Sequence, residues 1–365
     1  MKVGIIGLPN VGKSTIFNAL TASDIPANNY PFCTIEPNVG IVPVPDNRLI
    51  EINTYINSDN IVPTVIEFVD IAGLVKGASK GEGLGNKFLS HIRNVDAIVH
   101  VVRGFDNDDI THVEGSLDPL RDVQIIETEL LLKDLEKLNN RLLKVQKISK
   151  SGDKLAIQEV NLLEQAIAKL NSGELLNNFS GSDSDNVIIK SWFLLTGKPI
   201  IYLCNIDEDS LQDIEASKYY TNLKKYAIKN NIQCLPLCGN IEMEISKIND
   251  LDDKKDFLDM YNLDEPGLYK LISLAYNNLG LITFFTAGVK EIRAWTILKN
   301  ASAPNAAGVI HTDFERGFIK AEIYHIDDLQ KYKNEIALRD NGKIRQEGKD
   351  YIVQDGDIIF FKFNV

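Results

Sequence analysis

Apolar runs alternate with helical patterns through the first 280 residues of the chain. Strands that alternate with helices in this way form a mostly parallel sheet with helices on both faces. The pattern therefore predicts an α/β fold with a doubly wound sheet, closed by a helix at 266–278. The runs that predict its buried strands are 3–6, 64–70, 97–102, 199–204 and 232–237.

A second pattern interrupts the first between residues 122 and 185. Leucine and valine recur there at intervals of three and four, which predicts a coiled-coil seam. A turn at 151–153 separates the seam from a second amphipathic helix, so this segment predicts an antiparallel helical arm. The seam comprises Leu131, Leu135, Leu138, Leu142 and Val145, and the second helix carries Leu155, Leu162, Leu163, Ala166, Ile167 and Leu170.

From residue 280 onward the pattern changes to short strands between short helices, which by itself predicts a small α+β module. The predicted strands are 281–286, 294–298, 318–324, 350–353 and 358–363, with a hairpin-like turn at Asp355-Gly356-Asp357. The predicted domain boundaries are therefore 1–121 with 186–279 for the first domain, 122–185 for the arm and 280–365 for the last module.

The composition limits the partners of the chain. Its 51 acidic side chains outnumber the 39 basic ones, which argues against a surface that coats nucleic acid as a whole but allows a local basic patch. No apolar run approaches the ~18 residues of a membrane span, and the first residues lead directly into a strand without a signal peptide. We expect a cytoplasmic protein without a membrane partner, and we take it to be a monomer.

The residues directly after the first strand are the most informative in the chain. They read G-L-P-N-V-G-K-S from Gly7 to Ser14 and lead into a helix predicted to begin at Lys13. In this Walker A pattern the glycines let backbone N–H groups converge, the helix N-terminus adds its positive dipole end, and Lys13 supplies a mobile cation. We therefore predict a site for the phosphates of a nucleotide.

Two further segments supply groups that can sense a bound nucleotide. Ser14 and Thr34 each offer a hydroxyl to Mg²⁺, and Asp70 can hold the ion through its water shell. Gly73 completes a D-x-x-G motif, in which its backbone N–H can bond the terminal phosphate. Leu74 stands where Ras-like enzymes carry the glutamine that orients water, and leucine has no donor or acceptor. Either hydrolysis is slow or another group enters the site.

Two polar residues have open roles. His112 lies in a loop after the strand at 97–102 and could act in catalysis by positioning water, although a loop histidine is more often simply solvated. Asn10 could offer its side-chain oxygen to a K⁺ ion beside the phosphates, or it could serve its own turn.

The base-recognition motif favours ATP over GTP. GTPases read guanine with N-K-x-D after a later strand, and this chain has Asn205, Ile206 and Glu208 at the three defined positions. Glutamate is one methylene longer than the aspartate that accepts from guanine, whereas asparagine pairs well with adenine. Ile206 can offer an apolar wall to either base. We predict that Asn205, Ile206 and Glu208 contact adenine.

With these residues in view, the chain resembles the YchF family of Obg-related P-loop proteins. The resemblance covers nearly the whole length, although Asn240 stands where relatives have a small residue, which leaves the strictness of the ATP preference open. The matching runs are G-L-P-N-V-G-K-S, P-F-C-T-I-E-P-N, F-V-D-I-A-G-L-V-K-G-A-S-K-G-E-G-L-G-N, N-x-x-E at 205–208, F-F-T-A-G-V-K-E-I-R-A-W-T at 284–296 and A-A-G-V-I-H-T-D-F-E-R-G-F-I at 306–319.

The resemblance implies a GTPase-shaped ATPase that associates with ribosomes and ends in a TGS domain of the β-grasp fold. It implies Mg²⁺ ligands at Ser14 and Thr34, an adenine contact at Ile206, and a candidate catalytic histidine at His112. The ATP phosphate loop that it implies is Asn10, Val11, Gly12, Lys13, Ser14 and Thr15.

The basic residues allow two interpretations. A stripe near the tip of the arm is usually only a solvated face, but the ribosome-linked resemblance makes an RNA contact equally reasonable. Three basic residues of the last module could likewise contact RNA or simply be exposed to solvent. The stripe is Arg141, Lys144, Lys147, Lys150 and Lys154, and the module carries Lys343, Arg345 and Lys349.

The residues therefore predict a slow ATPase that uses Mg²⁺, with K⁺ as a candidate activator, and the resemblance implies that it acts on the ribosome, where it modulates translation or a stress response. Two alternatives stay open. One is a GTP-preferring translation factor, which Asn240 supports. The other is a binding module that holds ATP without hydrolysing it, which Leu74 supports.

Overall fold

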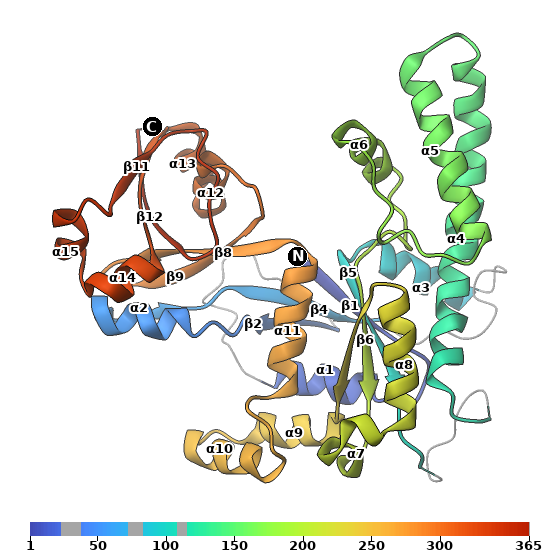
Figure 1. Ribbon diagram of the computed structural model, residues 1–365, viewed down its shortest axis with the longest axis horizontal. Helices are drawn as coiled ribbons and strands as arrows, with labels where there is room; N and C mark the ends of the chain where they lie inside the picture. The colour runs from blue at the N-terminus through green and yellow to red at the C-terminus, as the bar shows by residue number, and fades with distance from the viewer. Residues whose placement is uncertain (23–37, 72–82, 108–114, 365) are drawn as a thin grey trace. The chain divides into compact units, whose positions relative to one another are not determined.

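The structure, a computed structural model, describes residues 1–22, 38–71, 83–107 and 115–364 (Figure 1). Within these ranges, no helix combines the length and the apolar character needed to cross a membrane.

The chain divides into two compact units, and each is discontinuous in sequence. The first unit comprises Met1–Ile41 and Glu67–Leu271. The second comprises Val42–Ile66 and Ile272–Val365. The chain therefore enters the second unit twice.

The first unit is built on a six-stranded sheet with the order β2-β4-β1-β5-β6-β7. β1 pairs in parallel with β4 and β5, and the parallel ladder continues through β6 to β7. β5 and β6 are buried along their whole length, as expected for parallel strands covered on both faces. The predicted doubly wound α/β fold is confirmed. The strands are β1 Lys2–Ile6, β2 Val39–Pro43, β4 Val65–Asp70, β5 Ala97–Arg103, β6 Ile200–Asn205 and β7 Gln233–Leu237.

Side-chain caps mark where several helices begin. The hydroxyl of Ser217 accepts from the backbone N–H of Tyr220 at the start of α8, and Asp207 accepts from that of Ser210 at the start of α7. α1 begins after Gly12 without a side-chain cap, which leaves backbone N–H groups for a ligand. The helices are α1 Lys13–Thr21, α3 Gly83–Arg93, α6 Asp183–Ser191, α7 Glu208–Gln212, α8 Lys218–Lys229, α9 Gly239–Lys247, α10 Leu251–Met260 and α11 Gly267–Asn278.

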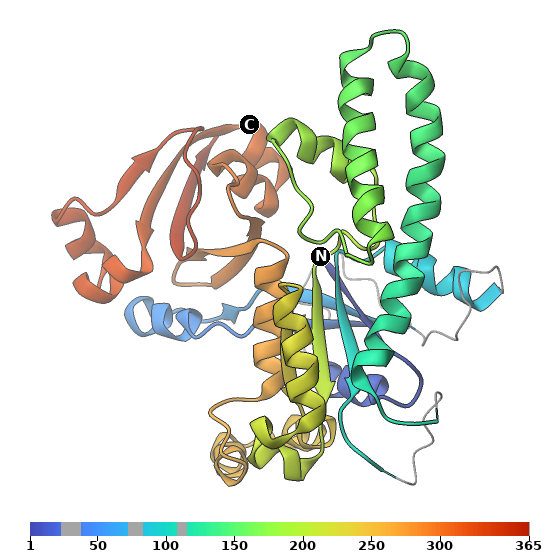
Figure 2. The ribbon, with the colours of Figure 1, turned by 45° about the vertical axis from the view of Figure 1, so that its right-hand side comes forward.

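The predicted antiparallel arm consists of α4 (Pro119–Ser149) and α5 (Lys154–Asn171), which lie side by side in Figures 1 and 2. Asp118 and Asp153 cap the two helices, each by accepting from the backbone N–H three residues further on. The apolar positions of both helices meet in one cluster with Trp192. Its buried members include Leu138, Val145, Leu162, Leu163, Ala166 and Leu170, and Leu131, Leu135, Leu142 and Ile167 pack against it.

Buried acidic side chains join the first half of α4 to its neighbours, at what we call the arm junction. Asp134 is 1% exposed and accepts from two successive backbone N–H groups, the second that of Thr196 (2.8 Å), and from the Thr196 hydroxyl (2.7 Å). Glu127 accepts from the hydroxyls of Tyr202 on β6 and Tyr226 on α8. Burial raises the pKa of both carboxyl groups, although these hydrogen bonds oppose the rise.

The second unit has a mixed six-stranded sheet with the order β11-β10-β12-β8-β9-β3. β8 and β9 form an antiparallel hairpin, β12 runs parallel to β8, and β10 is antiparallel to β12 and β11. This mixed sheet agrees with the predicted β-grasp fold. The elements are β8 Leu281–Ala287, β9 Ile292–Leu298, α12 Ala303–Ile310, α13 Thr312–Arg316, β10 Phe318–His325, α14 Ile326–Tyr332, α15 Glu335–Asp340, β11 Arg345–Glu347 and β12 Asp357–Phe363.

One segment of the second unit comes from the middle of the first. Residues Val42–Ile66, which we call the excursion, contribute α2 (Arg48–Ile56) and β3 (Ile61–Val62). β3 pairs in parallel with β9, and α2 buries Leu49 and Ile52 in an apolar cluster. The excursion is therefore part of the core of the second unit.

Two apolar clusters occupy the two faces of the second sheet. Phe284 and Phe285 are successive on β8, so their side chains point to opposite faces. Phe284 lies in a cluster with the alanines of α12, and Phe285 lies in the cluster that contains Leu49 and Ile52 of α2.

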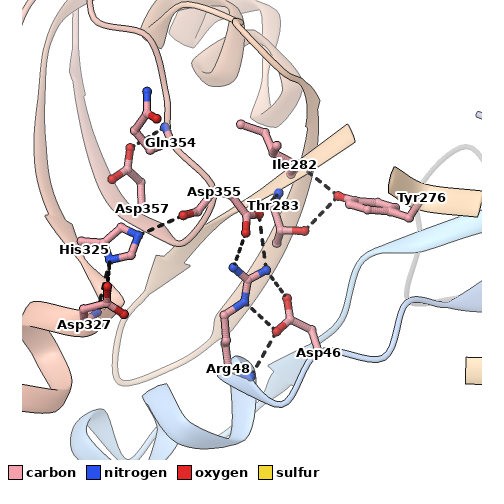
Figure 3. A network of polar contacts seen from close by, with 10 residues as sticks. All are labelled: Asp46, Arg48, Tyr276, Ile282, Thr283, His325, Asp327, Gln354, Asp355 and Asp357. Carbon is pink, nitrogen blue, oxygen red and sulfur yellow. Dashed lines mark hydrogen bonds and ion pairs between the residues drawn. The ribbon is translucent and has the colours of Figure 1, made fainter. Parts of the chain in front are cut away.

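An ion-pair network fixes the start of α2 (Figure 3). The guanidinium of Arg48 lies between Asp46 and Asp355, with N–O distances of 2.7 Å to each. Asp355 also accepts from the backbone N–H of Thr283 on β8 at 2.8 Å. Burial would lower the pKa of Arg48, but its bonds to the two carboxylates raise it on balance, so the guanidinium stays charged.

Two expectations for the second unit are wrong. Residues 350–353 do not form a strand, because only Ile352 makes an isolated bridge, to Ser302. The turn at 355–357 does not close a hairpin, because β12 pairs with β10 and β8. The N–H of Gly356 instead donates to the carbonyl of Thr283 at 2.9 Å, so the turn docks on β8.

The compact units also differ from the predicted boundaries. The prediction placed 42–66 in the first domain and began the last module at residue 280. The second unit includes 42–66 and resumes at Ile272. The separation of the first unit into a sheet domain and an arm stays a prediction.

Candidate nucleotide-binding site

The predicted phosphate loop lies at the carboxyl end of β1, where the chain turns into α1. Asn10 and Gly12 both have left-handed backbone conformations, with φ of 62° and 94°. At Gly12 a side chain would also be blocked, since its Cβ would lie 2.2 Å from Nδ2 of Asn205. The loop therefore keeps a tight path that brings uncapped N–H groups of α1 to its surface, next to the half-buried Lys13.

The other loop residues divide between packing and surface. Val11 is 1% exposed and faces the core, whereas Ser14 is exposed and Thr15 is half-buried. An exposed hydroxyl in the first turn of the helix can reach a metal ion beside bound phosphates. The position of Ser14 therefore agrees with its predicted role.

Asp70 ends β4 beside the start of the phosphate loop. It lies opposite Ile5 in the parallel pair of β4 with β1, two residues before the loop begins at Gly7. Its Oδ1 is buried and has no hydrogen-bond partner in the part of the chain that the structure describes. A buried, unpaired carboxylate oxygen is costly unless a ligand binds it, so this atom fits a role in holding Mg²⁺ with its water shell.

Asn205 joins the phosphate loop to the base-recognition region. Its side-chain N–H donates to the carbonyl of Val11 at 3.0 Å, and its side-chain oxygen accepts from the N–H of Gly239 at 2.9 Å. Both ends of the amide are therefore used within the protein, and one amide hydrogen is left for a base. The bracing role was missed from sequence, because its partners lie far along the chain.

A cavity of about 330 Å³ lies next to this brace and includes all three predicted base contacts. Ile206 is 1% exposed, and its N–H donates to the carbonyl of Leu237. Glu208 is exposed in the first turn of α7. The cavity is lined by Phe105, Asp106, Asn107, Asn205, Ile206, Asp207, Glu208, Asp209, Cys238 and Asn240.

One wall of the cavity was not predicted. Phe105 and Asn107 follow β5, and Arg103 holds both: its guanidinium donates to the two carbonyls at 2.9 Å and lies 4.9 Å from the centre of the Phe105 ring. Arg103 is only 3% exposed. A buried arginine at the end of an apolar strand was the available signal, since such a residue needs fixed acceptors.

Several predicted residues lie outside the described ranges. These are Thr34, Gly73, Leu74 and His112. Their predicted roles in Mg²⁺ binding, phosphate sensing and catalysis stay predictions.

The basic residues named from the sequence differ in their surroundings. Arg141 pairs with Glu159, whereas Lys144, Lys147, Lys150 and Lys154 are exposed. In the second unit Lys343 pairs with Asp328 at 3.2 Å, and Arg345 donates to the hydroxyl of Tyr351. Arg141, Lys343 and Arg345 therefore bond to other residues of the protein, and the RNA contact stays a prediction.

Comparison with known proteins covers the chain from end to end. Residues 2–145 match a family model described as a 50S ribosome-binding GTPase. Residues 281–364 match the model of the YchF C-terminal domain, which is described as a protein of unknown function.

Relatives match over their full length. The "Ribosome-binding ATPase YchF" of Haemophilus ducreyi is 50% identical over 364 residues, which is 100% of this chain and 99% of that protein. The protein of the same name from Bacillus subtilis is 47% identical over 365 residues, with both chains covered completely. The structure of the Schizosaccharomyces pombe YchF GTPase is 40% identical and superposes with a TM-score of 0.89 over 99% of this chain and 97% of that chain.

The parallel sheet, the loop at 7–14 and Asp70 at the end of β4 define a P-loop protein of the GTPase-like class, whose members bind nucleotide together with Mg²⁺. Within this class, the full-length relatives described above are all named YchF. The chain belongs to the YchF family.

Proposed function

We propose that the chain is an ATPase switch that associates with the ribosome and modulates translation or a stress response. The observation that carries the choice of nucleotide is the composition of the base cavity. Two residues in it, Ile206 and Glu208, replace the lysine and aspartate of a guanine-reading motif. The names of the relatives differ on the nucleotide, since the bacterial proteins are called ATPases and the S. pombe protein is called a GTPase.

The cavity suits adenine better than guanine for a physical reason. Guanine needs a carboxylate that accepts from two of its N–H groups at once. Glu208 is exposed and one methylene longer, and Ile206 is buried and offers only an apolar side chain. Adenine needs no such carboxylate, because one amide hydrogen of Asn205 and backbone N–H groups can bond to its ring nitrogens. Asn240 could add a bond to either base.

The phosphate end would act through charge and position. Lys13 and the uncapped N–H groups of α1 bind the phosphate oxygens. Ser14, Thr34 and Asp70 would hold Mg²⁺, which neutralises charge on the phosphates when it is bound. Gly73 would bond the terminal phosphate through its backbone, and His112 would position the attacking water. Asn10 would offer an oxygen to K⁺.

Leu74 predicts slow intrinsic turnover. With no glutamine to orient water, the rate is expected near the ~10⁻⁴–10⁻³ s⁻¹ of an unstimulated Ras-type enzyme. A purified chain that hydrolyses many ATP molecules per second would contradict this mechanism. No hydrolysis in the presence of ribosomes and K⁺ would favour a binding module that uses ATP only as a ligand.

Titration calorimetry with ATP and with GTP, each with Mg²⁺ and K⁺, tests the proposal. We expect ATP to bind at least about tenfold more tightly, which corresponds to ~1.4 kcal/mol. Ile206→Lys with Glu208→Asp restores the guanine motif and should reduce the preference. Tighter binding of GTP by the unaltered chain would instead support a translation GTPase.

The ribosome is proposed as the partner because the full-length relatives are named ribosome-binding proteins. Such a partner implies that the protein works in the cytoplasm. Sedimentation with ribosomes, in ATP and without nucleotide, tests the association and its dependence on the switch.

A further inference from the structure

A second cavity in the first unit is separate from the nucleotide site. It has a volume of about 590 Å³ and lies where α8 meets the start of α4. We call it the lysine groove. It is lined by Leu117, Asp118, Pro119, Leu120, Lys218, Tyr219, Asn222, Lys225, Tyr226 and Lys229.

Three lysines and one asparagine of the groove form one row. Lys218, Asn222, Lys225 and Lys229 follow each other at intervals of four, three and four, so they share one face of α8. All four side chains are exposed. At ~1.5 Å per residue the row is ~16 Å long, which is too long for the end lysines to share a single phosphate ion. The row therefore fits an extended anion.

These lysines have no acidic partner among the residues that the structure describes. Within the described ranges, no ion pair involves Lys218, Lys225 or Lys229, whereas Lys224 on the same helix pairs with Glu215. Asp118 supplies the one carboxylate among the described lining residues, and it is engaged as the cap of α4, where it accepts from the N–H of Arg121. Unpaired lysines along a groove stand out in a chain with a net charge of −12.

Two tyrosines lie on the same side of α8 as the lysines. Both are half-buried, and their hydroxyls are engaged: Tyr219 donates to Asp106 at 2.8 Å, and Tyr226 donates to Glu127 at 2.7 Å. With the hydroxyls bound to protein, the rings are held in place. Fixed aromatic rings beside a line of cations are typical of surfaces that bind single-stranded nucleic acid.

We propose that the lysine groove binds a single strand of RNA, with the phosphates along Lys218, Lys225 and Lys229 and a base against Tyr219. RNA is the occupant because the row is extended, carries three lysines and is flanked by aromatic rings. The inference rests on the proposed ribosome partner only for the source of the RNA. It adds a site on α8 that is distinct from the tip of the arm.

The hydrogen bond of Tyr219 to Asp106 connects the groove to the nucleotide site. Asp106 lines the base cavity, between Phe105 and Asn107. RNA that stacks on Tyr219 would therefore act through this bond on Asp106, and so on one wall of the base cavity. This contact gives RNA a direct route by which to change nucleotide affinity.

The test is fluorescence anisotropy with a labelled single-stranded RNA of about 16 nucleotides. The variant carries Lys218→Ala, Lys225→Ala and Lys229→Ala. We expect binding at ~0.1 M salt to weaken at least tenfold, and the slope of log affinity against log salt to fall by ~2, because three phosphate contacts are lost. Replacement of the same lysines by arginine keeps the charges and should keep the affinity. It also controls for folding, together with unchanged ATP binding.

The matched control removes three lysines from the arm: Lys144→Ala, Lys147→Ala and Lys150→Ala. Binding that falls only in the α8 variant supports the proposal. Binding that survives in the α8 variant overturns it. Complete competition by inorganic phosphate, or equal affinity for polyglutamate, also overturns it, because the groove would then take a single ion or an acidic protein.

Ribosome sedimentation separates this inference from the proposed function. If the unaltered chain sediments with ribosomes and the α8 variant binds the labelled RNA as tightly as the unaltered chain, the groove proposal fails and the proposed function stands. If the unaltered chain binds the RNA but not ribosomes, the proposed function fails and the groove proposal stands.

Discussion

Two segments leave the nucleotide-binding sheet, and they are held in opposite ways. The arm returns to the first unit and is fixed at its base by buried carboxylates, Asp134 and Glu127. The excursion joins the second unit and is held by apolar side chains, Leu49 and Ile52, with an ion-pair network at the rim.

The two attachments differ in whether they mainly stabilise a segment or mainly fix its orientation. Burial of apolar surface is strong but weakly directional, whereas a buried carboxylate is favourable only when its donors are in place. Apolar burial should therefore account for the stability of the excursion. The arm junction should instead define an orientation. The following changes test this contrast.

The largest effect is expected in the excursion. Leu49→Ala or Ile52→Ala removes a fully buried side chain, at a cost of ~2–5 kcal/mol from the lost transfer energy and the cavity. Hydrogen exchange on peptides of β8 and β9 should show this loss. Ile50→Ala is the matched control, since Ile50 is 65% exposed and its loss should cost under ~0.5 kcal/mol. Equal loss of protection in β5 and β6 would show that the excursion does not belong to the second unit alone.

At the arm junction, Asp134→Ala leaves two N–H groups and the Thr196 hydroxyl without their acceptor. We expect a cost of ~3 kcal/mol, because unsatisfied buried groups cost ~1–3 kcal/mol each and some will reach water. The urea midpoint followed by Trp192 fluorescence, in a Trp295→Phe background, measures it. Glu136→Ala on the exposed side of α4 is the control. A variant as stable as the parent would mean that water already serves these donors.

His100 on β5, next to the arm junction, should make stability depend on pH. Burial lowers the pKa of His100, which contacts the ring of Tyr202, from an ordinary 6.5 to about 3. Between these values the unfolded chain binds a proton on this residue that the folded chain does not, so the contribution of His100 to stability falls as pH falls below 6.5, by ~1.4 kcal/mol per pH unit. The raised pKa values of Glu127 and Asp134 act in the opposite sense. His100→Leu should remove this slope in urea midpoints at pH 5 and pH 6. If the urea midpoints of the parent and of His100→Leu change equally with pH, His100 is not the cause of the pH dependence.

The smallest effect is expected in the rim network. A double-mutant cycle of Arg48→Met and Asp355→Asn should give a coupling energy of ~1 kcal/mol or less, since Asp355 is half exposed and water screens the pair. The free energy of unfolding of the second unit, from urea titration, measures it. Coupling above ~3 kcal/mol would mean that ions rather than apolar contacts hold the excursion.

The sequence predicted the arm and missed the excursion, for a physical reason. Leu138 and Val145 recur in a local pattern, and their partners in α5 lie only a short turn away. Leu49 and Ile52 lie in a helix of nine residues, and their partner Phe285 is more than two hundred residues further on. No local pattern carries such a contact.

The same distinction applies within the nucleotide site. Gly12 and Lys13 were predicted, because a phosphate loop is built from consecutive residues. Arg103 and the wall that it holds at Phe105 and Asn107 were not, because the base cavity is assembled from separate loops that only the fold brings together.

The excursion has a consequence for how such genes can recombine. A DNA segment that encodes only residues 281–364 carries Phe285 but not the α2 side chains that cover it. An exchange of that segment between relatives would pair each cluster with a foreign helix. The codons for Leu49 and Ile52 therefore need to stay matched to the part of the gene that encodes residues 281–364. The two regions are far apart in the gene, so a recombination event between them can separate them.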